Sequence, residues 1–92
     1  MSNFKENVLS VVRKIKKGKI MTYKSVAERV SSPRAARAVG SIMRGNYDLS
    51  VPCHRVIKSD GTIGDYNRGG KQKKIEILKS EGVKFRGERV LI

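Results

Sequence analysis

A large excess of positive charge is the feature that most constrains this sequence. The 92 residues include 21 lysines and arginines against 8 aspartates and glutamates, which gives a formal net charge of +13 at pH 7. Self-repulsion of this size opposes compaction, and it is most common in chains whose charge a polyanion neutralises. The charge therefore indicates nucleic acid as the first partner to consider and an anionic membrane as the second. No apolar run approaches the ~18 residues that a membrane span needs, and the first residues contain no apolar signal-peptide segment, so we expect no membrane partner.

The length predicts a single domain covering residues 1–92, because a chain this short has no room for a second core. The one cysteine, Cys53, has no internal disulfide partner. A lone cysteine fits a reducing compartment, either the cytoplasm, where the protein would be nucleoid-associated, or the nucleus. One Cys and one His also lack the ligands for structural zinc, so we expect neither a metal site nor a cofactor.

Apolar residues recur at helical spacing in four segments, each bounded by a capping or helix-terminating residue. The segments run from Phe4 to about Gly18, from Tyr23 to about Val30 after the cap Thr22, from Pro33 to about Met43, and from Lys71 to Glu81 before Gly82. The second and third, joined by a tight turn, predict a helix-turn-helix. A short β-hairpin is expected between Val56–Ile57 and Thr62–Ile63, because Asp60-Gly61 is a strong turn signal. The fold class is therefore mainly α with a short β-hairpin, a single winged-helix-like domain, with the tail from Val83 to Ile92 packed back on the body.

The third predicted helix has a surface suited to DNA. Its apolar residues Val39, Ile42 and Met43 form a buried side, while Arg34, Arg37 and Ser41 lie opposite with small alanines between them. Small side chains with a few arginines let a helix backbone approach a duplex closely. The alternative is an ordinary solvated surface helix, and the net charge favours DNA contact.

The run from Val51 to Val56 contains the residues best suited to carry out a chemical reaction. A lone cysteine is by default a small buried hydrophobe. Here Pro52 precedes Cys53, His54 can act as a base and Arg55 adds positive potential, which together favour the nucleophilic thiolate. In an extended chain His54 would act through a water, and a carboxylate elsewhere would orient its ring. This chemistry needs a sulfur that is reachable beside a pocket.

Several motifs in order carry a resemblance to the active-site domain of the O6-alkylguanine-DNA alkyltransferases. They are Tyr23, Arg34-Ala35-Ala36-Arg37-Ala38-Val39-Gly40, Met43-Arg44-Gly45-Asn46, Pro52-Cys53-His54-Arg55-Val56, Ser59-Asp60-Gly61, Gly64-Asp65-Tyr66, Gly69-Gly70, Lys74 and Glu81-Gly82. The resemblance covers nearly the whole chain. It implies direct and irreversible repair, in which the protein binds the minor groove of double-stranded DNA as a monomer, flips an O6-alkylguanine out of the stack and transfers the alkyl group to its own cysteine.

The resemblance also implies a role for each matching residue. Cys53 is the acceptor, His54 takes its proton through a water, Glu81 holds the His54 ring, Asn46 is a hinge before the active-site loop, and Tyr23 helps rotate the target phosphate and assists the leaving base. The residues expected to contact DNA are Arg34, Ala35, Ala36, Arg37 as an inserted finger, Ser41, Arg44 and Tyr23. The residues expected around the guanine are Pro52, Val56, Tyr66, Asn67 and Lys74.

The sequence departs from the family pattern in three places. The 92 residues match only the active-site domain, so we expect no counterpart of the N-terminal domain that many members have. The loop of residues 47–52 is about one residue shorter and lacks the usual prolines, which bears on pocket shape. Arg68 resembles an insertion, and Asn67 replaces a small hydroxyl residue, which bears on alkyl-size preference.

Two other functions compete with repair. Alkyltransferase-like proteins are short relatives that bind alkylated guanine without repairing it; they commonly carry another residue in place of the cysteine, so Cys53 argues against this class. A basic helix-turn-helix regulator would explain the charge but would leave His54, Asn46, Tyr66 and Glu81 without roles.

Overall fold

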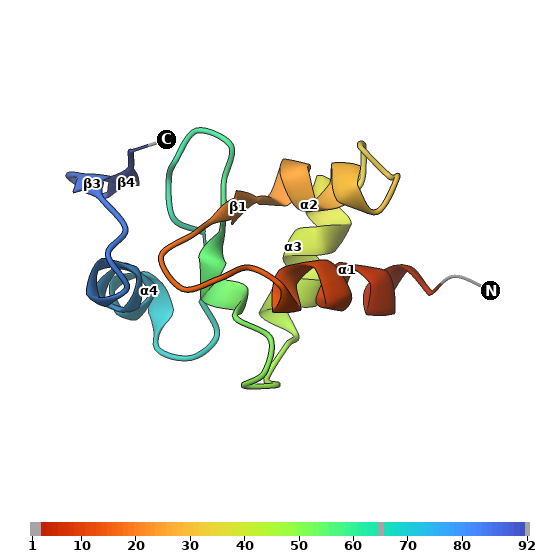
Figure 1. Ribbon diagram of the computed structural model, residues 1–92, viewed down its shortest axis with the longest axis horizontal. Coiled ribbons are helices and arrows are strands. Elements are labelled where there is room, and N and C mark those ends of the chain that lie inside the picture. Colours follow the sequence, from red (N-terminus) through yellow and green to blue (C-terminus); the bar gives the residue numbers. More distant parts are fainter. Residues whose placement is uncertain (1–2, 65, 92) are drawn as a thin grey trace.

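The computed structural model describes residues 3–64 and 66–91. The described part contains four α-helices, one 3-10 turn and four very short strands (Figure 1). In chain order these are α1 (Phe4–Arg13), β1 (Met21–Thr22), α2 (Tyr23–Arg29), α3 (Ala36–Arg44), the 3-10 turn η1 (Cys53–Arg55), β2 (Val56–Ile57), α4 (Gly70–Ser80), β3 (Phe85–Arg86) and β4 (Arg89–Val90). The expected mainly helical domain is thus confirmed. Within the described residues, no helix is long and apolar enough to cross a membrane.

Helix α1 is shorter than its apolar pattern predicts. The side chain of Asn3 caps its start by accepting a hydrogen bond from the Glu6 amide at 3.2 Å. The helix ends at Arg13, and the prediction that it continues to Gly18 is wrong. Gly18 instead has a positive φ of 84° in a separate turn, closed by a 2.9 Å bond from the Lys19 amide to the Lys16 carbonyl. Ile15 remains buried beyond the helix end, so its place in the apolar pattern reflects burial and not helix.

The capping and proline signals predicted the start of α2 correctly but not the start of α3. The Oγ1 of Thr22 accepts a bond from the Ser25 amide at 3.0 Å, so the predicted cap of α2 is confirmed. Helix α3 begins at Ala36, and its predicted start at Pro33 is wrong. A turn closed by a 2.9 Å bond from the Ala35 amide to the Ser32 carbonyl occupies that position. The fixed φ of proline suits such a turn as well as a first helical turn.

Strand β2 pairs with a different partner from the one expected. Val56 and Ile57 form a parallel ladder with Met21 and Thr22, so the predicted hairpin between Val56–Ile57 and Thr62–Ile63 is wrong. The Asp60-Gly61 turn does form, with the Lys58 amide bonded to the Thr62 carbonyl at 3.1 Å, but Thr62 then bridges to Arg89. Both β2 residues are completely buried, which is typical of a parallel strand covered on both faces. The hairpin that does form is β3–β4.

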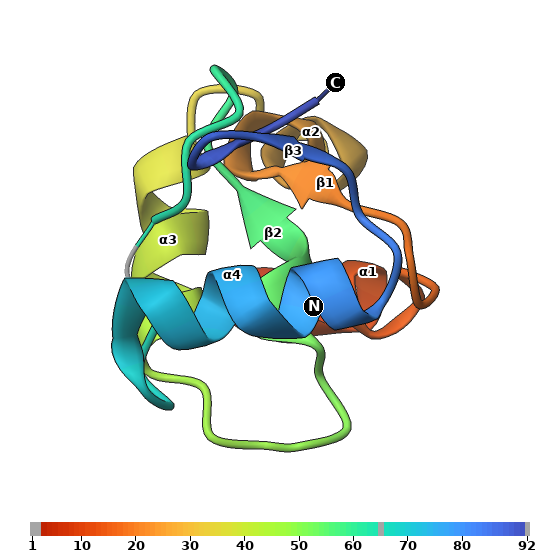
Figure 2. The same ribbon diagram turned by 90° about the vertical axis from the view of Figure 1, so that its left-hand side faces the viewer.

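Two apolar clusters meet at β2. The first joins the three N-terminal helices to residues 51–56, and the second lies under α4 and the C-terminal hairpin. Successive strand residues point to opposite faces, so Val56 enters the first cluster and Ile57 the second. Figure 2 shows β2 between α3 and the connection from α1 to β1, with α4 crossing in front. The tail packs back as predicted through buried Val90, whereas Leu91 is exposed and Ile92 lies outside the described residues.

Candidate active site and nucleic-acid interface

The imidazole of His54 is hydrogen-bonded to a carboxylate, as we expected from the sequence. Turn η1 presents His54 toward the C-terminal end of α4, where Glu81 is the helix-capping residue. The Nε2 of His54 donates to Oε2 of Glu81 at 3.0 Å, and both side chains are largely buried. Arg55 binds the same carboxylate in bidentate fashion, with Nε at 3.0 Å from Oε1 and Nη2 at 2.9 Å from Oε2. The three side chains form one hydrogen-bonded unit, with an ion pair between Arg55 and Glu81.

The pKa values fit a histidine that works as a base. Hydrogen bonds from Arg55 and then from His54 lower the pKa of the Glu81 carboxyl from 4.5 to about 2, so Glu81 is ionised and acts only as an acceptor. Burial lowers the pKa of His54 below its usual 6.5, although Glu81 opposes this. The imidazole is therefore neutral at pH 7. Because its Nε2–H faces Glu81, its Nδ1 is the atom that can accept a proton.

Cys53 is less accessible than the sequence leads one to expect. It is only 4% exposed and belongs to the first apolar cluster, beside Val51 and Val56. Its amide donates to the Val51 carbonyl at 2.8 Å, which fixes the entry into η1. Arg55 also differs from expectation, since its guanidinium is bound by Glu81 and by the Ile15 carbonyl at 2.7 Å. Its charge is thus neutralised locally and is not directed only at the sulfur.

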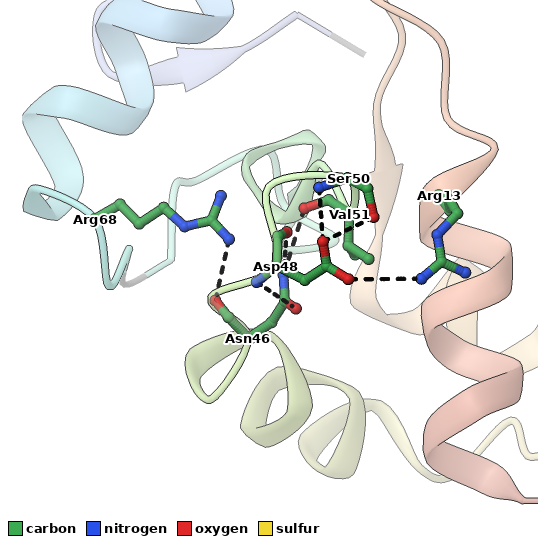
Figure 3. Close-up of polar contacts among 6 residues, drawn as sticks. All are labelled: Arg13, Asn46, Asp48, Ser50, Val51 and Arg68. Atoms are coloured by element: carbon green, nitrogen blue, oxygen red, sulfur yellow. Dashed lines mark hydrogen bonds and ion pairs between the residues drawn. The ribbon is translucent and has the colours of Figure 1, made fainter.

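Asn46 organises the loop that leads to Cys53. The side chain is buried, and its Oδ1 accepts a bond from the Asp48 amide at 3.2 Å while its Nδ2 donates to the Val51 carbonyl at 3.4 Å. Figure 3 shows that Asp48 continues this network, accepting from the amide of Ser50 at 2.9 Å and its hydroxyl at 2.8 Å, and pairing with Arg13 at 3.9 Å. The bonds from Ser50 lower the pKa of the Asp48 carboxyl. These contacts hold the loop that leads to Cys53 in one conformation.

The loop after Ile63 approaches the site from the other side. The Tyr66 ring lies edge-on to the His54 ring with centroids 6.5 Å apart and packs against the cluster that contains Cys53. Asn67 binds the end of α3, its Nδ2 donating to the carbonyls of Arg44 at 2.6 Å and Asn46 at 2.8 Å. Arg68, the residue that resembles an insertion, also reaches the Asn46 carbonyl, at 3.4 Å (Figure 3). Tyr66 thus lies at the site, whereas the Asn67 side chain ties its loop to α3.

Three of the residues predicted to contact DNA, Arg37, Ser41 and Arg44, recur at helical spacing along one face of α3. Arg34, Arg37, Ser41 and Arg44 are exposed, while Ala35 and Ala36 are half-buried. Because α3 begins at Ala36, Arg34 and Ala35 lie in the preceding turn and not on the helix as predicted. Arg44 donates to the Ser41 hydroxyl at 3.1 Å. The surface keeps the expected combination of small and cationic side chains despite the later helix start.

A hollow of about 290 Å³ lies beside the first turns of α3. It is lined by Tyr23, Ala36, Arg37, Gly40, Lys58 and Ser59, and its volume is near the lower end of the ~300–1,000 Å³ of typical ligand clefts. The Nζ of buried Lys74 lies 3.4 Å from the Tyr23 hydroxyl, and a Cβ on Gly64 would come within 2.8 Å of that oxygen. Tyr23 and Arg37, from two different helices, thus line the same hollow.

Some contributors to these sites were not singled out from sequence. Lys58 and Ser59 join the hollow because the turn before Gly61 folds toward α3. From the sequence both were assigned to that turn, and Ser59 also to the Ser59-Asp60-Gly61 motif, but neither was given a role at a site. Pro52 is half-buried, and the Val56 side chain is fully buried in the core, so only its main chain remains for contact with a base.

Residues 3–83 match the family model described as "6-O-methylguanine DNA methyltransferase, DNA binding domain". The chain belongs to this family. Relatives include a methylated-DNA–protein-cysteine methyltransferase from Rattus norvegicus, which is 42% identical over 83 residues, covering 88% of this chain and 40% of the relative. The match thus confirms the family to which the sequence motifs pointed. The chain spans less than half the length of the curated relatives that match it first.

Solved structures of two kinds share this fold. S. pombe Atl1, in complex with damaged DNA containing O6-carboxymethylguanine, has a TM-score of 0.81 and 36% identity over 94% of this chain and 83% of its own. The Mycobacterium tuberculosis OGT in complex with DNA has the same TM-score and 34% identity over 89% of this chain and 50% of its own. The mostly helical architecture with small sheets is therefore that of the methyltransferase family.

Proposed function

We propose that this chain acts as an active-site domain that repairs double-stranded DNA, transferring the alkyl group from O6 of guanine to Sγ of Cys53. The observation that supports this most strongly is the neutral His54 imidazole, fixed by Glu81 at 3.0 Å and directly following the cysteine. A buried carboxylate that orients a histidine beside a nucleophile is the arrangement that activates it. Family membership supplies the alkylated base as the substrate to test.

The proposed reaction balances without a cofactor. Through one water, Nδ1 of His54 takes the thiol proton of Cys53, and the thiolate attacks the alkyl carbon. A carbon–sulfur bond forms as the carbon–O6 bond breaks, and the electron pair passes to the guanine. Tyr23, whose hydroxyl oxygen accepts a hydrogen bond from Nζ of Lys74 at 3.4 Å, donates a proton or hydrogen bond to the leaving base. The thioether that forms is a stable product, and in this proposal each molecule therefore reacts once.

DNA binding is proposed to use α2 and α3 as the helix-turn-helix of a winged-helix-like domain. Helix α3 enters the minor groove with its small residues against the backbone, and Arg37 fills the space left by the everted guanine. Flipping costs a few kcal/mol and is least costly where the lesion already weakens pairing. In this proposal the displaced nucleotide passes the hollow that Tyr23 and Arg37 help to line.

The burial of Cys53 sets a condition on this mechanism. At 4% exposure the sulfur is not available for in-line attack until its cover moves. Tyr66, which packs against the Cys53 cluster from the loop after Ile63, is the side chain we propose is displaced by the guanine. Reactivity would then depend on base flipping, and the free thiol would react slowly with small alkylating reagents.

The second candidate is a sensor that binds alkylated guanine in DNA without efficient transfer. The observations that favour it are the covered sulfur and the likeness to S. pombe Atl1. A sensor needs the same α3 surface and the same hollow beside Tyr23 and Arg37, but it does not need a reachable thiolate.

Binding and transfer are separated by two variants. Fluorescence anisotropy with duplexes carrying either O6-methylguanine or guanine should show tighter binding to the alkylated duplex. Cys53→Ala should keep that affinity and lose transfer of a radiolabelled methyl group. Arg37→Ala should weaken binding and transfer together; unchanged repair by this variant would exclude the proposed insertion of Arg37. Wild-type binding without transfer would favour the sensor.

A further inference from the structure

A second concentration of positive charge lies away from α3. The seven residues from Arg13 to Lys19 include five cations, and all of these except Arg13 lie in the connection between α1 and β1. Figure 2 shows this connection and α3 on opposite sides of the central strands. A minor-groove interface built on α3 therefore leaves these charges facing away from the bound duplex.

The cations in this region are free to bind an external anion. We define the basic rim as Lys14, Lys16, Lys17, Lys19 and Arg29, all of which are exposed. In the described part of the chain no ion pair or side-chain hydrogen bond to any of them is observed, whereas Arg13 pairs with Asp48 at 3.9 Å. Glu28 lines an adjoining hollow together with Arg29, so Arg29 has an acidic residue nearby.

Most of the rim converges on one concavity. Lys14, Lys16, Lys19 and Arg29, from the end of α1, the following turn and the end of α2, line a hollow of about 230 Å³. The rest of its lining is apolar: Val11, Ile15, Ile20 and Met21. Cations around an apolar floor suit a sugar–phosphate backbone, with phosphates on the ammonium groups and deoxyribose on the floor. No aromatic residue lines this hollow, so base stacking contributes nothing to it.

The rim is held in place by the core of the protein. Gly18 adopts its positive φ against α4, and a Cβ there would lie only 3.0 Å from the Glu81 carbonyl oxygen. The neighbouring Ile15 is buried, and its carbonyl accepts a 2.7 Å bond from Arg55. A fixed backbone lowers the entropy cost of presenting the lysines to a ligand.

We propose that the basic rim binds the phosphate backbone of a second segment of duplex DNA, so that one molecule bridges two segments. This goes beyond the proposed repair, and only the bridging, not the phosphate contact, depends on α3 binding the first segment. Four of the five rim cations are lysines, which act as point charges without bidentate geometry and suit sequence-independent phosphate contacts better than recognition of one acidic peptide.

The test is capture of a fluorescent duplex by an undamaged duplex fixed to beads, with protein added at low salt. The rim variant Lys16→Gln/Lys17→Gln/Lys19→Gln is compared with the control Lys73→Gln/Lys84→Gln/Arg86→Gln, which removes the same charge from exposed positions on α4 and near the C-terminal hairpin. Circular dichroism and thermal melting check folding, and anisotropy with one O6-methylguanine duplex measures the α3 interface separately.

We expect wild type and control to bridge the duplexes and the rim variant to lose at least ten-fold in capture, with single-duplex affinity retained within about three-fold. Each phosphate contact adds about 0.9 to the slope of the logarithm of the binding constant against the logarithm of the salt concentration. This slope for capture should therefore be steeper by about 2 to 3 for the wild type than for the rim variant, which lacks three lysines. Equal capture by the two variants overturns the proposal, as does wild type that binds the O6-methylguanine duplex without bridging. If the rim variant loses binding to phosphatidylserine vesicles while its DNA capture is unchanged, the rim binds membranes, and this result also overturns the proposal.

Discussion

Replacing Glu81 by Gln tests the unit that fixes His54. Hydrogen bonds from Arg55 and His54 hold the pKa of the Glu81 carboxyl at about 2, against an ordinary value of 4.5. Since one pKa unit corresponds to ~1.4 kcal/mol, ionised Glu81 contributes about 3 kcal/mol to folding. Because the pKa is lower in the folded state, this stability is fully present above the unfolded pKa of about 4.5 and is lost as pH falls toward 2. Glu81→Gln should therefore lower the free energy of unfolding by about 3 kcal/mol at pH 7.

Urea denaturation followed by circular dichroism measures this effect between pH 7 and pH 2. The difference between wild type and Glu81→Gln should shrink as the pH falls below 5, because protonation removes the same charge from the wild type. Glu88→Gln is the control, since that carboxylate is exposed and contacts only Lys71 and Gln72 among the described residues; its stability should stay near that of the wild type. Equal stability of Glu81→Gln and wild type at pH 7, with parallel pH profiles, would refute the assigned role of the carboxylate.

Three further changes probe the site from different sides. Asn67→Ala removes the amide bonded to the carbonyls at the end of α3 and should cost about 1–3 kcal/mol in urea denaturation; no loss would show that water replaces it. Gly64→Ala places a Cβ 2.8 Å from the Tyr23 hydroxyl and should weaken binding to alkylated duplex by anisotropy, whereas Gly45→Ala, with no atom nearer than 3.6 Å, should not; equal effects would contradict the steric reason. Because burial lowers the pKa of His54, the methyl-transfer rate should fall to half only below pH 6.5, and a midpoint above that value would be inconsistent with a buried base.

Local chemistry was enough to predict the elements whose ends are set by nearby residues. Thr22 caps α2 through the amide of Ser25, and α4 ends before Gly82, whose φ of 92° is the signal expected of a helix terminator. Pro33 shows the limit of such signals. Its fixed φ suits both a turn and a helix start, and the turn from Ser32 to Ala35 took precedence.

Strand pairing could not be predicted from a turn signal. The Asp60-Gly61 turn forms, yet β2 pairs with β1, and its residues Val56 and Ile57 belong to two separate apolar clusters. That choice depends on contacts distant in sequence, which a local pattern does not contain.

The site was predictable in composition more than in geometry. The motif around Cys53 and the resemblance led to His54 and Glu81, which the structure joins. Two features were missed: the bidentate binding of Glu81 by Arg55 and the cover over Cys53. Both depend on how α4 and the loop after Ile63 pack against η1, which periodicity does not reveal.

The most direct test of repair is the intact mass of the protein after incubation with a duplex containing O6-methylguanine. Direct transfer predicts an increase of one methyl group, assigned by peptide mapping to Cys53, with stoichiometric loss of O6-methylguanine from the DNA. An unchanged protein mass under conditions where the alkylated duplex is bound would contradict transfer and identify the chain as a sensor.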